Sequence, residues 1–161
     1  MAIKTFTYKL YNHKKNKNLH RMITMNGLLY NHILSLYNRY YHFTRTFDAI
    51  QKGVTYKEAK GKLPHKYAIE TKLIQLKRTC KKFNYILLLP SRVLHYTIAR
   101  LNNAIKMACK KDNNRRWPHF RKIKEYPSFT FDTASYKFDE SNHRVTIMKR
   151  DYKYFKDRNL E

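Results

Sequence analysis

Hydrophobic and polar positions follow two different periods along the chain, one typical of strands and one typical of helices. From Ala2 to Tyr11 they alternate, which predicts a half-buried strand. A lysine-rich loop is expected over residues 12–18. From Leu19 apolar residues recur at steps of three and four, which predicts a long helix to about Phe43. The residues expected on its inner face are Leu19, Met22, Ile23, Asn26, Leu29, Tyr30, Ile33, Tyr37 and Tyr40.

A polar segment and a second helix are expected next. Residues 46–62 contain two glycines and many polar residues, so they are expected to be mostly loop. Within this segment, Thr55–Glu58 has the form of a capping box, which would start a short helix. A second helix is expected from His65 to about Phe83. Its expected inward residues are Tyr67, Ile69, Leu73, Leu76 and Cys80.

The clearest helical pattern runs from Ser91 to Lys111. Ser91 follows Pro90 and is expected to be the N-cap, because its hydroxyl can accept a hydrogen bond from a free backbone N–H group. The apolar stripe consists of Val93, Leu94, Ile98, Leu101, Ile105 and Ala108, and the opposite face carries Arg92, His95, Arg100, Asn103 and Lys106. Together the three helices are expected to form a small antiparallel bundle.

Period two returns in the last part of the chain. Strands are expected at 128–131, 136–138 and 144–148, with a polar turn at 139–143 that predicts a hairpin, and at 152–155. The first strand needs partner strands, and only this C-terminal region can supply them. The sequence therefore predicts an α+β fold in which a helical unit is inserted into a small sheet.

Charge points to the class of partner. The chain has 161 residues, with 35 Lys and Arg against 11 Asp and Glu, a formal net charge of +24. Such an excess favours association with a strongly anionic partner, and nucleic acid is the first candidate. No apolar run approaches the roughly 20 residues of a membrane-spanning helix, and no secretory signal is recognised. The expected compartment is therefore intracellular, in the cytoplasm or at the nucleoid.

Neither a metal site nor a catalytic site is predicted. Cys80 and Cys109 form no CxxC pair, and the eight histidines show no metal-ligand spacing, so no cofactor is expected. Asp132 and Asp139 are better explained as strand-edge or turn residues than as a catalytic pair.

Basic and aromatic residues are interleaved after the third helix, a combination that suits phosphate contacts and base stacking. Trp117 taken alone fits a core anchor better than a stacking platform. The lysines near the first strand, including Lys17, fit either a basic surface or ordinary solubilising residues. The candidate contacts to RNA or heteroduplex backbone are Lys4, Lys9, Lys14, Lys15, Arg115, Arg116, Trp117, Phe120, Arg121 and Lys122.

An ordered set of segments carries a family resemblance. These segments are IKTFTYKLYNHKKNK, LLYNHIL, GVTYKEAKGKL, SRVLHYTIARLNNAI, WPHFRK and SFTF. In this order and spacing they resemble the N-terminal part of TnpB proteins, which are transposon-encoded RNA-guided nucleases related to type V CRISPR effectors. Arg116 stands where that family usually has glycine before the aromatic–proline pair.

The resemblance implies both domains and partners. It implies a small β-barrel wedge domain over 1–12 and 113–156, with an inserted helical recognition domain over 13–112. A tail is left over 157–161, and its last two residues, Leu160 and Glu161, would suit an expression-vector scar. It implies guide RNA and target DNA as partners, with base pairing reading the target and protein reading a short flanking DNA motif. The residues it selects for that motif are Tyr56, Lys60, Ser91, Arg92 and His95. For these residues the alternative is plain packing for Tyr56 and a solvated helix face for Arg92 and His95.

The family's RuvC nuclease domain is not expected in this chain. No Asp-x-Gly strand and no CxxC pair occurs in the sequence, so the chain is not expected to cut DNA, and the nuclease region would act in cis or in trans. Two other classes stay open: an RNA-independent, sequence-specific DNA-binding domain of the helix-turn-helix transposase or repressor type, and a basic protein resembling ribosomal proteins or RNA chaperones.

Overall fold

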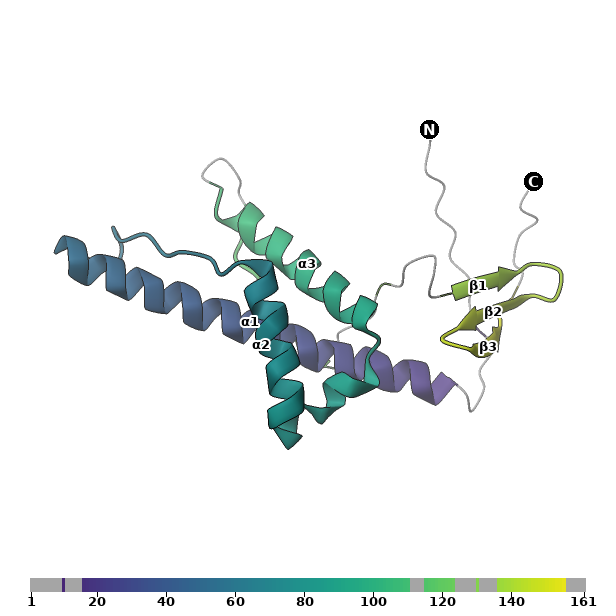
Figure 1. Ribbon diagram of the computed structural model, residues 1–161. Helices are drawn as coiled ribbons and strands as arrows, with labels where there is room; N and C mark the ends of the chain where they lie inside the picture. Colours follow the sequence, from purple (N-terminus) through teal and green to yellow (C-terminus); the bar gives the residue numbers. More distant parts are fainter. Residues whose placement is uncertain (1–9, 11–15, 111–114, 124–129, 131–135, 156–161) are drawn as a thin grey trace. The chain divides into compact units, whose positions relative to one another are not determined.

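The computed structural model describes Leu10, residues 16–110, residues 115–123, Thr130 and residues 136–155. These residues form a mixed α and β structure (Figure 1), as the sequence predicts. The helices are α1 (Asn16–Lys52), α2 (Lys66–Thr79), the 3-10 helix η1 (Lys81–Leu88) and α3 (Ser91–Ala108). The strands are β1 (Tyr136–Asp139), β2 (Arg144–Ile147) and β3 (Arg150–Lys153).

The chain divides into two compact units. One unit comprises residues 22–130, and the other combines residues 1–21 with residues 131–161. The second unit therefore joins the two ends of the chain. The described residues do not test the predicted boundaries at 12 and 113, because parts of the chain near both boundaries lie outside them.

Helix α1 is longer than predicted at both ends, so the loops expected at 12–18 and 46–62 each lose residues to it. It ends where Gly53 adopts a positive φ of 62°. The Gly53 N–H bonds to the Ile50 carbonyl at 3.4 Å, and the Val54 N–H bonds to the Ala49 carbonyl at 3.1 Å. This pair of bonds is the Schellman arrangement, in which glycine supplies the left-handed residue after the last turn.

The core of the helical unit lies where the sequence pattern predicts it. From α1, the predicted residues Leu29, Ile33 and Tyr37 are fully buried. Leu34, which was not predicted to face inward, is also fully buried, while Tyr40, expected to face inward, is exposed. On α3, the predicted stripe from Val93 to Ile105 is buried and the predicted opposite face is exposed, with only Ala108 partly open.

Two buried polar pairs connect α1 to α3. The Thr97 hydroxyl donates to Asn26 Oδ1 at 2.7 Å, and the Tyr37 hydroxyl donates to Asn102 Oδ1 at 3.1 Å. Buried polar groups cost free energy unless they are paired, so these two bonds fix both the rotation and the register of α3 on α1. Burial, with a smaller contribution from Glu70, raises the pKa of Tyr37 to about 12, which keeps the hydroxyl protonated as the donor.

The expected antiparallel bundle does not form. Figure 1 shows α2 lying across α1 rather than along it. Helix α2 ends at Thr79, before the predicted Phe83, because Cys80 adopts an extended conformation that starts η1. Tyr67, expected to face inward, is exposed and packs locally against His65 at 5.1 Å.

The three strands form an antiparallel sheet in the order β1-β2-β3. It is open rather than barrel-shaped over the part of the chain that the structure describes. The predicted hairpin is confirmed by the pairing of Tyr136 with Ile147 and of Asp139 with Arg144. Leu10, from the predicted first strand, forms a bridge with Tyr154.

The rest of that first strand lies outside the described residues, as does the strand expected at 128–131 apart from Thr130. Among the helices that the structure describes, none is long and apolar enough to cross a membrane.

Candidate nucleic-acid interface

The basic segment 115–123, which we call the strap, runs along α1 in the opposite direction. Trp117 Nε1 donates to Asn38 Oδ1 at 2.9 Å near one end. Nearer the other end, the Asn31 side chain bonds the Arg121 backbone twice: its amide nitrogen donates to the carbonyl at 2.8 Å, and its amide oxygen accepts from the N–H at 3.0 Å. These bonds hold the strap by its backbone and by one indole ring.

The strap directs its charged side chains outward. Trp117 is half-buried, in agreement with the core-anchor interpretation. The exposed residues are Arg115, Arg116, His119, Phe120, Arg121 and Lys122. The Arg121 guanidinium lies 5.9 Å from the centre of the Tyr30 ring, at the outer limit of a cation–π contact. The predicted basic residues of this segment and Phe120 are therefore exposed, and only Trp117 is half-buried.

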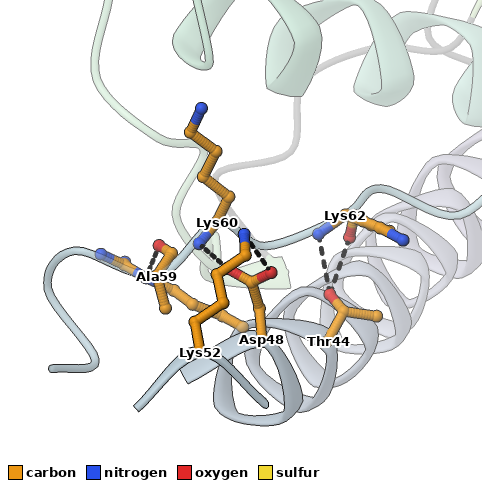
Figure 2. Close-up of polar contacts among 7 residues, drawn as sticks. Thr44, Asp48, Lys52, Ala59, Lys60 and Lys62 are labelled. Carbon is orange, nitrogen blue, oxygen red and sulfur yellow. Dashed lines mark hydrogen bonds and ion pairs between the residues drawn. The ribbon is translucent and has the colours of Figure 1, made fainter. Parts of the chain in front are cut away.

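A second segment, residues 53–63, packs against the last turns of α1; we call it the loop. The Asp48 carboxylate accepts a hydrogen bond from the Lys60 N–H at 2.8 Å, and it forms an ion pair with Lys52 Nζ at 2.7 Å (Figure 2). Thr44 Oγ1 bonds both backbone groups of Lys62, accepting from its N–H at 2.8 Å and donating to its carbonyl at 3.2 Å. The Lys60 side chain extends away from Asp48 (Figure 2), so only its backbone is used in packing the loop.

Arg45 is the main side chain holding the loop, and sequence reasoning did not single it out. Its Nε donates to the Ala59 carbonyl at 3.0 Å and one terminal nitrogen donates to the Lys57 carbonyl at 2.8 Å. Its guanidinium carbon also lies 4.5 Å from the centre of the Tyr56 ring. The ring of Tyr56 stacks on His42, and the two side chains share a hydrogen bond.

The capping box expected at Thr55–Glu58 forms only in part. The Glu58 carboxylate accepts from the Thr55 N–H at 3.0 Å, as a capping box requires. The Thr55 hydroxyl, however, donates to the same carboxylate rather than accepting from the backbone. The segment makes a single turn, and the predicted short helix does not form.

The start of α3 carries the remaining predicted residues, and one assignment is wrong. Ser91 is the first helical residue, and Pro90 occupies the N-cap position with no side-chain cap bond. Pro90 has φ −57° and ψ 143°, and this ψ lies outside the helical region, so the cap falls one residue earlier than predicted. Ser91 and Arg92 are both exposed.

His95 is engaged within the protein. Its Nδ1 lies 3.0 Å from Glu70 Oε1 on α2, and the Glu70 side chain is mostly buried. Along the exposed face, Arg92, Tyr96 and Arg100 are spaced at four-residue steps, which places them in one row. Tyr96, which is 40% exposed, was not among the predicted residues, although its spacing between two arginines is visible in the sequence.

Acidic residues in the helical unit are occupied by local partners. Hydrogen bonds from the Lys52 side chain and the Lys60 backbone hold the pKa of Asp48 below its usual value. The hydrogen bonds from Thr55 lower the pKa of Glu58 in the same way. With Glu70 beside His95, the three described carboxylates of this unit do not neutralise the strap.

The lysines predicted near the first strand, Lys4, Lys9, Lys14 and Lys15, lie outside the described residues, and Lys17 is exposed on the first turn of α1. Within the described ranges, no three His, Cys, Asp or Glu side chains gather as they would to hold a metal ion. No protein-family model matches the chain, and no curated protein matches it either.

Proposed function

We propose that this chain binds nucleic acid as the wedge and recognition part of an RNA-guided DNA nuclease of the TnpB type, without the RuvC catalytic domain. The observation that carries the proposal is the strap. Asn31 and Asn38 on α1 hold its backbone and its indole ring, while its basic side chains and Phe120 stay exposed. Guanidinium groups pair with phosphate oxygens, and an exposed phenyl ring can stack on a base.

Base pairing would select the target in such a system, and the protein would hold RNA or heteroduplex by its backbone. That task needs many phosphate contacts, in keeping with the net charge of +24. We propose the strap as one set of these contacts, and Lys4, Lys9, Lys14 and Lys15 as a further set beside the first strand. In the same proposal, residues 1–12 and 113–156 form a small wedge domain built on the antiparallel sheet, and residues 13–112 are the inserted recognition domain.

Reading of the flanking DNA motif is assigned to the loop and the start of α3. Tyr56 and Lys60 present exposed side chains from a segment whose backbone is bound to α1. On α3, Arg92 is the best candidate for a guanine contact, because an arginine can donate two bonds to one guanine edge in the major groove. Ser91 lies beside it. His95 is a weaker candidate, because it already pairs with Glu70.

A second function is favoured by the row of Arg92, Tyr96 and Arg100 on α3. An exposed basic helix face of this kind also suits an RNA-independent DNA-binding domain, in which the helix enters the major groove. Catalysis is assigned to neither function, and no cofactor is proposed. The nuclease region would be supplied in cis or in trans.

A salt-series binding titration tests the proposal. It compares transposon-end guide RNA with scrambled RNA of equal length, and duplex DNA with and without a candidate flanking motif. All basic proteins bind nucleic acid at low salt, so the comparison is made near physiological salt. Selective RNA binding supports the RNA-guided function, and selective duplex binding without RNA supports the second function. Equal binding to every probe contradicts both.

Paired variants locate the binding surface. Replacing Arg115 and Arg116 by Gln should weaken RNA binding. It should also reduce the slope of log K against log salt concentration by the amount expected for the loss of about two phosphate contacts. The matched control replaces Lys77 and Arg78 on α2, which removes the same charge elsewhere. Tyr56→Ala and Arg92→Ala should instead reduce discrimination between duplexes. If both leave discrimination unchanged, the assignment of the flanking-motif residues is wrong.

A further inference from the structure

The turn between β2 and β3 adopts a backbone conformation that its residues disfavour. Ile147 pairs with Arg150, so the connecting turn consists of Met148 and Lys149 alone. Both have positive φ, 51° for Met148 and 63° for Lys149. A two-residue hairpin turn with positive φ at both positions is typical of type I′, which is normally built from Asn-Gly.

Neither Met148 nor Lys149 is a residue type that favours a positive φ. Residues other than glycine seldom adopt positive φ, and Asn is the side chain that best tolerates it. Each such residue costs free energy, and strain of this kind gathers at functional sites. The Met148 side chain is also 42% exposed, so burial in the sheet does not offset the strain. The turn therefore retains an apolar and a cationic residue where Asn-Gly would be more stable.

The register of the sheet gathers similar side chains at the same end. Tyr136 pairs with Ile147, which places its 39% exposed ring beside the base of the turn. Arg150 follows the turn directly and is exposed. Two exposed apolar side chains and two exposed cations therefore occupy one end of the sheet.

Acidic groups occupy other positions in this sheet. Asp139, the last residue of β1, and Glu140, which follows it in the turn to β2, lie at the opposite end, where Asp139 accepts hydrogen bonds from Asn142. Asp151 is bonded to the Thr146 hydroxyl at 2.6 Å within the sheet. Arg144 and Lys153 lie at the same far end as Asp139, so that end carries charges of both signs. The turn residues Met148 and Lys149, with Arg150 after them, form a tip that carries two cations and no carboxylate.

We propose that this tip is a second nucleic-acid contact, which takes a duplex. The Met148 side chain enters between base pairs, and Lys149 and Arg150 contact the flanking phosphates. Apolar side chains such as Met act as wedges of this kind, and adjacent cations neutralise the backbone at the distorted step. The inference rests on the proposed nucleic-acid-binding function and adds a site in the other unit of the chain.

The test uses the full chain, with a labelled RNA–DNA hybrid and an all-DNA duplex of the same sequence as probes. Met148→Asn relieves strain, so its melting temperature should rise by about 2–4 °C. The same change removes the wedge, so hybrid binding should weaken about fivefold or more, with the salt slope unchanged. Met148→Leu keeps an apolar side chain and should retain binding. Lys149→Gln should lower the salt slope by about one phosphate contact.

The outcomes separate this site from the general function. If Met148→Asn binds both probes as the wild type does, the turn has only a structural role and the inference is overturned. If Met148→Leu weakens duplex binding as much as Met148→Asn does, the proposal that an apolar side chain enters between base pairs is wrong. A wild-type chain that binds neither probe near physiological salt overturns the proposed function together with this site.

Discussion

A side-chain carbon placed on Gly61 would lie 2.5 Å from Cε2 of Tyr41, closer than any real contact allows. The loop backbone therefore passes directly over the Tyr41 ring. The same ring lies 5.0 Å from the ring of Trp117 in the strap. Tyr41 thus contacts both the loop and the strap, two of the segments that carry predicted nucleic-acid-binding residues, and a displacement of its ring would disturb them together.

Gly61→Ala should destabilise the protein by about 1–3 kcal/mol, because the added methyl group must displace the Tyr41 ring or the loop. Urea denaturation measures this loss. Gly53→Asn is the matched control, because a side chain there meets nothing within 4 Å and Asn tolerates the positive φ. That variant should stay within about 0.5 kcal/mol of the wild type. Equal stability of Gly61→Ala and the wild type would contradict the close approach.

Arg45→Ala should release the loop while the core stays folded. The change removes two hydrogen bonds to loop carbonyls and the contact with Tyr56, which are worth about 1–2 kcal/mol locally. Amide hydrogen exchange over residues 54–62 should accelerate, with little change in α3. Arg45→Lys keeps the charge but cannot bond both carbonyls in the same planar geometry, so it should resemble the alanine variant. Wild-type exchange in Arg45→Lys would mean that charge alone holds the loop.

Asn31→Ala should loosen the strap without changing any charge. Both bonds to the Arg121 backbone are lost, at a cost of about 1–2 kcal/mol. RNA binding should weaken about fivefold, because the strap backbone that carries the basic side chains is no longer held in place before binding. The control is Asn103→Ala, at an exposed position on α3. Equal effects of the two variants on RNA binding would show that the hold on Arg121 is unimportant.

The features predicted from the sequence are those set by local spacing. The buried stripe of α3 follows from apolar steps of three and four, and the β1–β2 hairpin follows from alternation around a polar turn. The glycine that ends α1, Gly53, is visible in the sequence as a residue that can adopt the left-handed conformation after a helix. The polar residues before it nevertheless favoured a loop, so the predicted helix ended too early. Local patterns therefore gave the elements more reliably than their ends.

The features missed depend on contacts between distant residues. Asn31 and Arg121 are 90 positions apart, and nothing in either neighbourhood indicates their pairing. Arg45 was one basic residue among 35, and only the folded loop places two carbonyls within its reach. Helix α2 contacts η1 and α3, and hydrophobic periodicity predicts the buried face of a helix but not its crossing angle.

Stability should fall as the pH falls below about 6.5, in part through His32. Burial, followed by the nearby charges of Arg39 and Lys82, lowers the pKa of His32. Its Nε2 is buried with no hydrogen-bond partner among the described residues, and its ring packs 4.5 Å from Phe83. Since the folded state holds this proton less tightly, the unfolded state binds more protons in this range. The contribution of His32 to stability is therefore complete above the pKa that His32 has in the unfolded state. It is lost as the pH falls toward the lower pKa that His32 has in the folded state.

His32→Phe removes the titrating group and keeps an aromatic ring against Phe83. Its free energy of unfolding should fall less than that of the wild type between about pH 7.5 and about pH 5. Phe83→Leu is the control, because it alters the same contact but leaves His32 in place, so it should be less stable yet keep the wild-type pH dependence. If His32→Phe instead loses stability in parallel with the wild type, other groups cause the acid sensitivity. In that case the buried ring contributes packing alone.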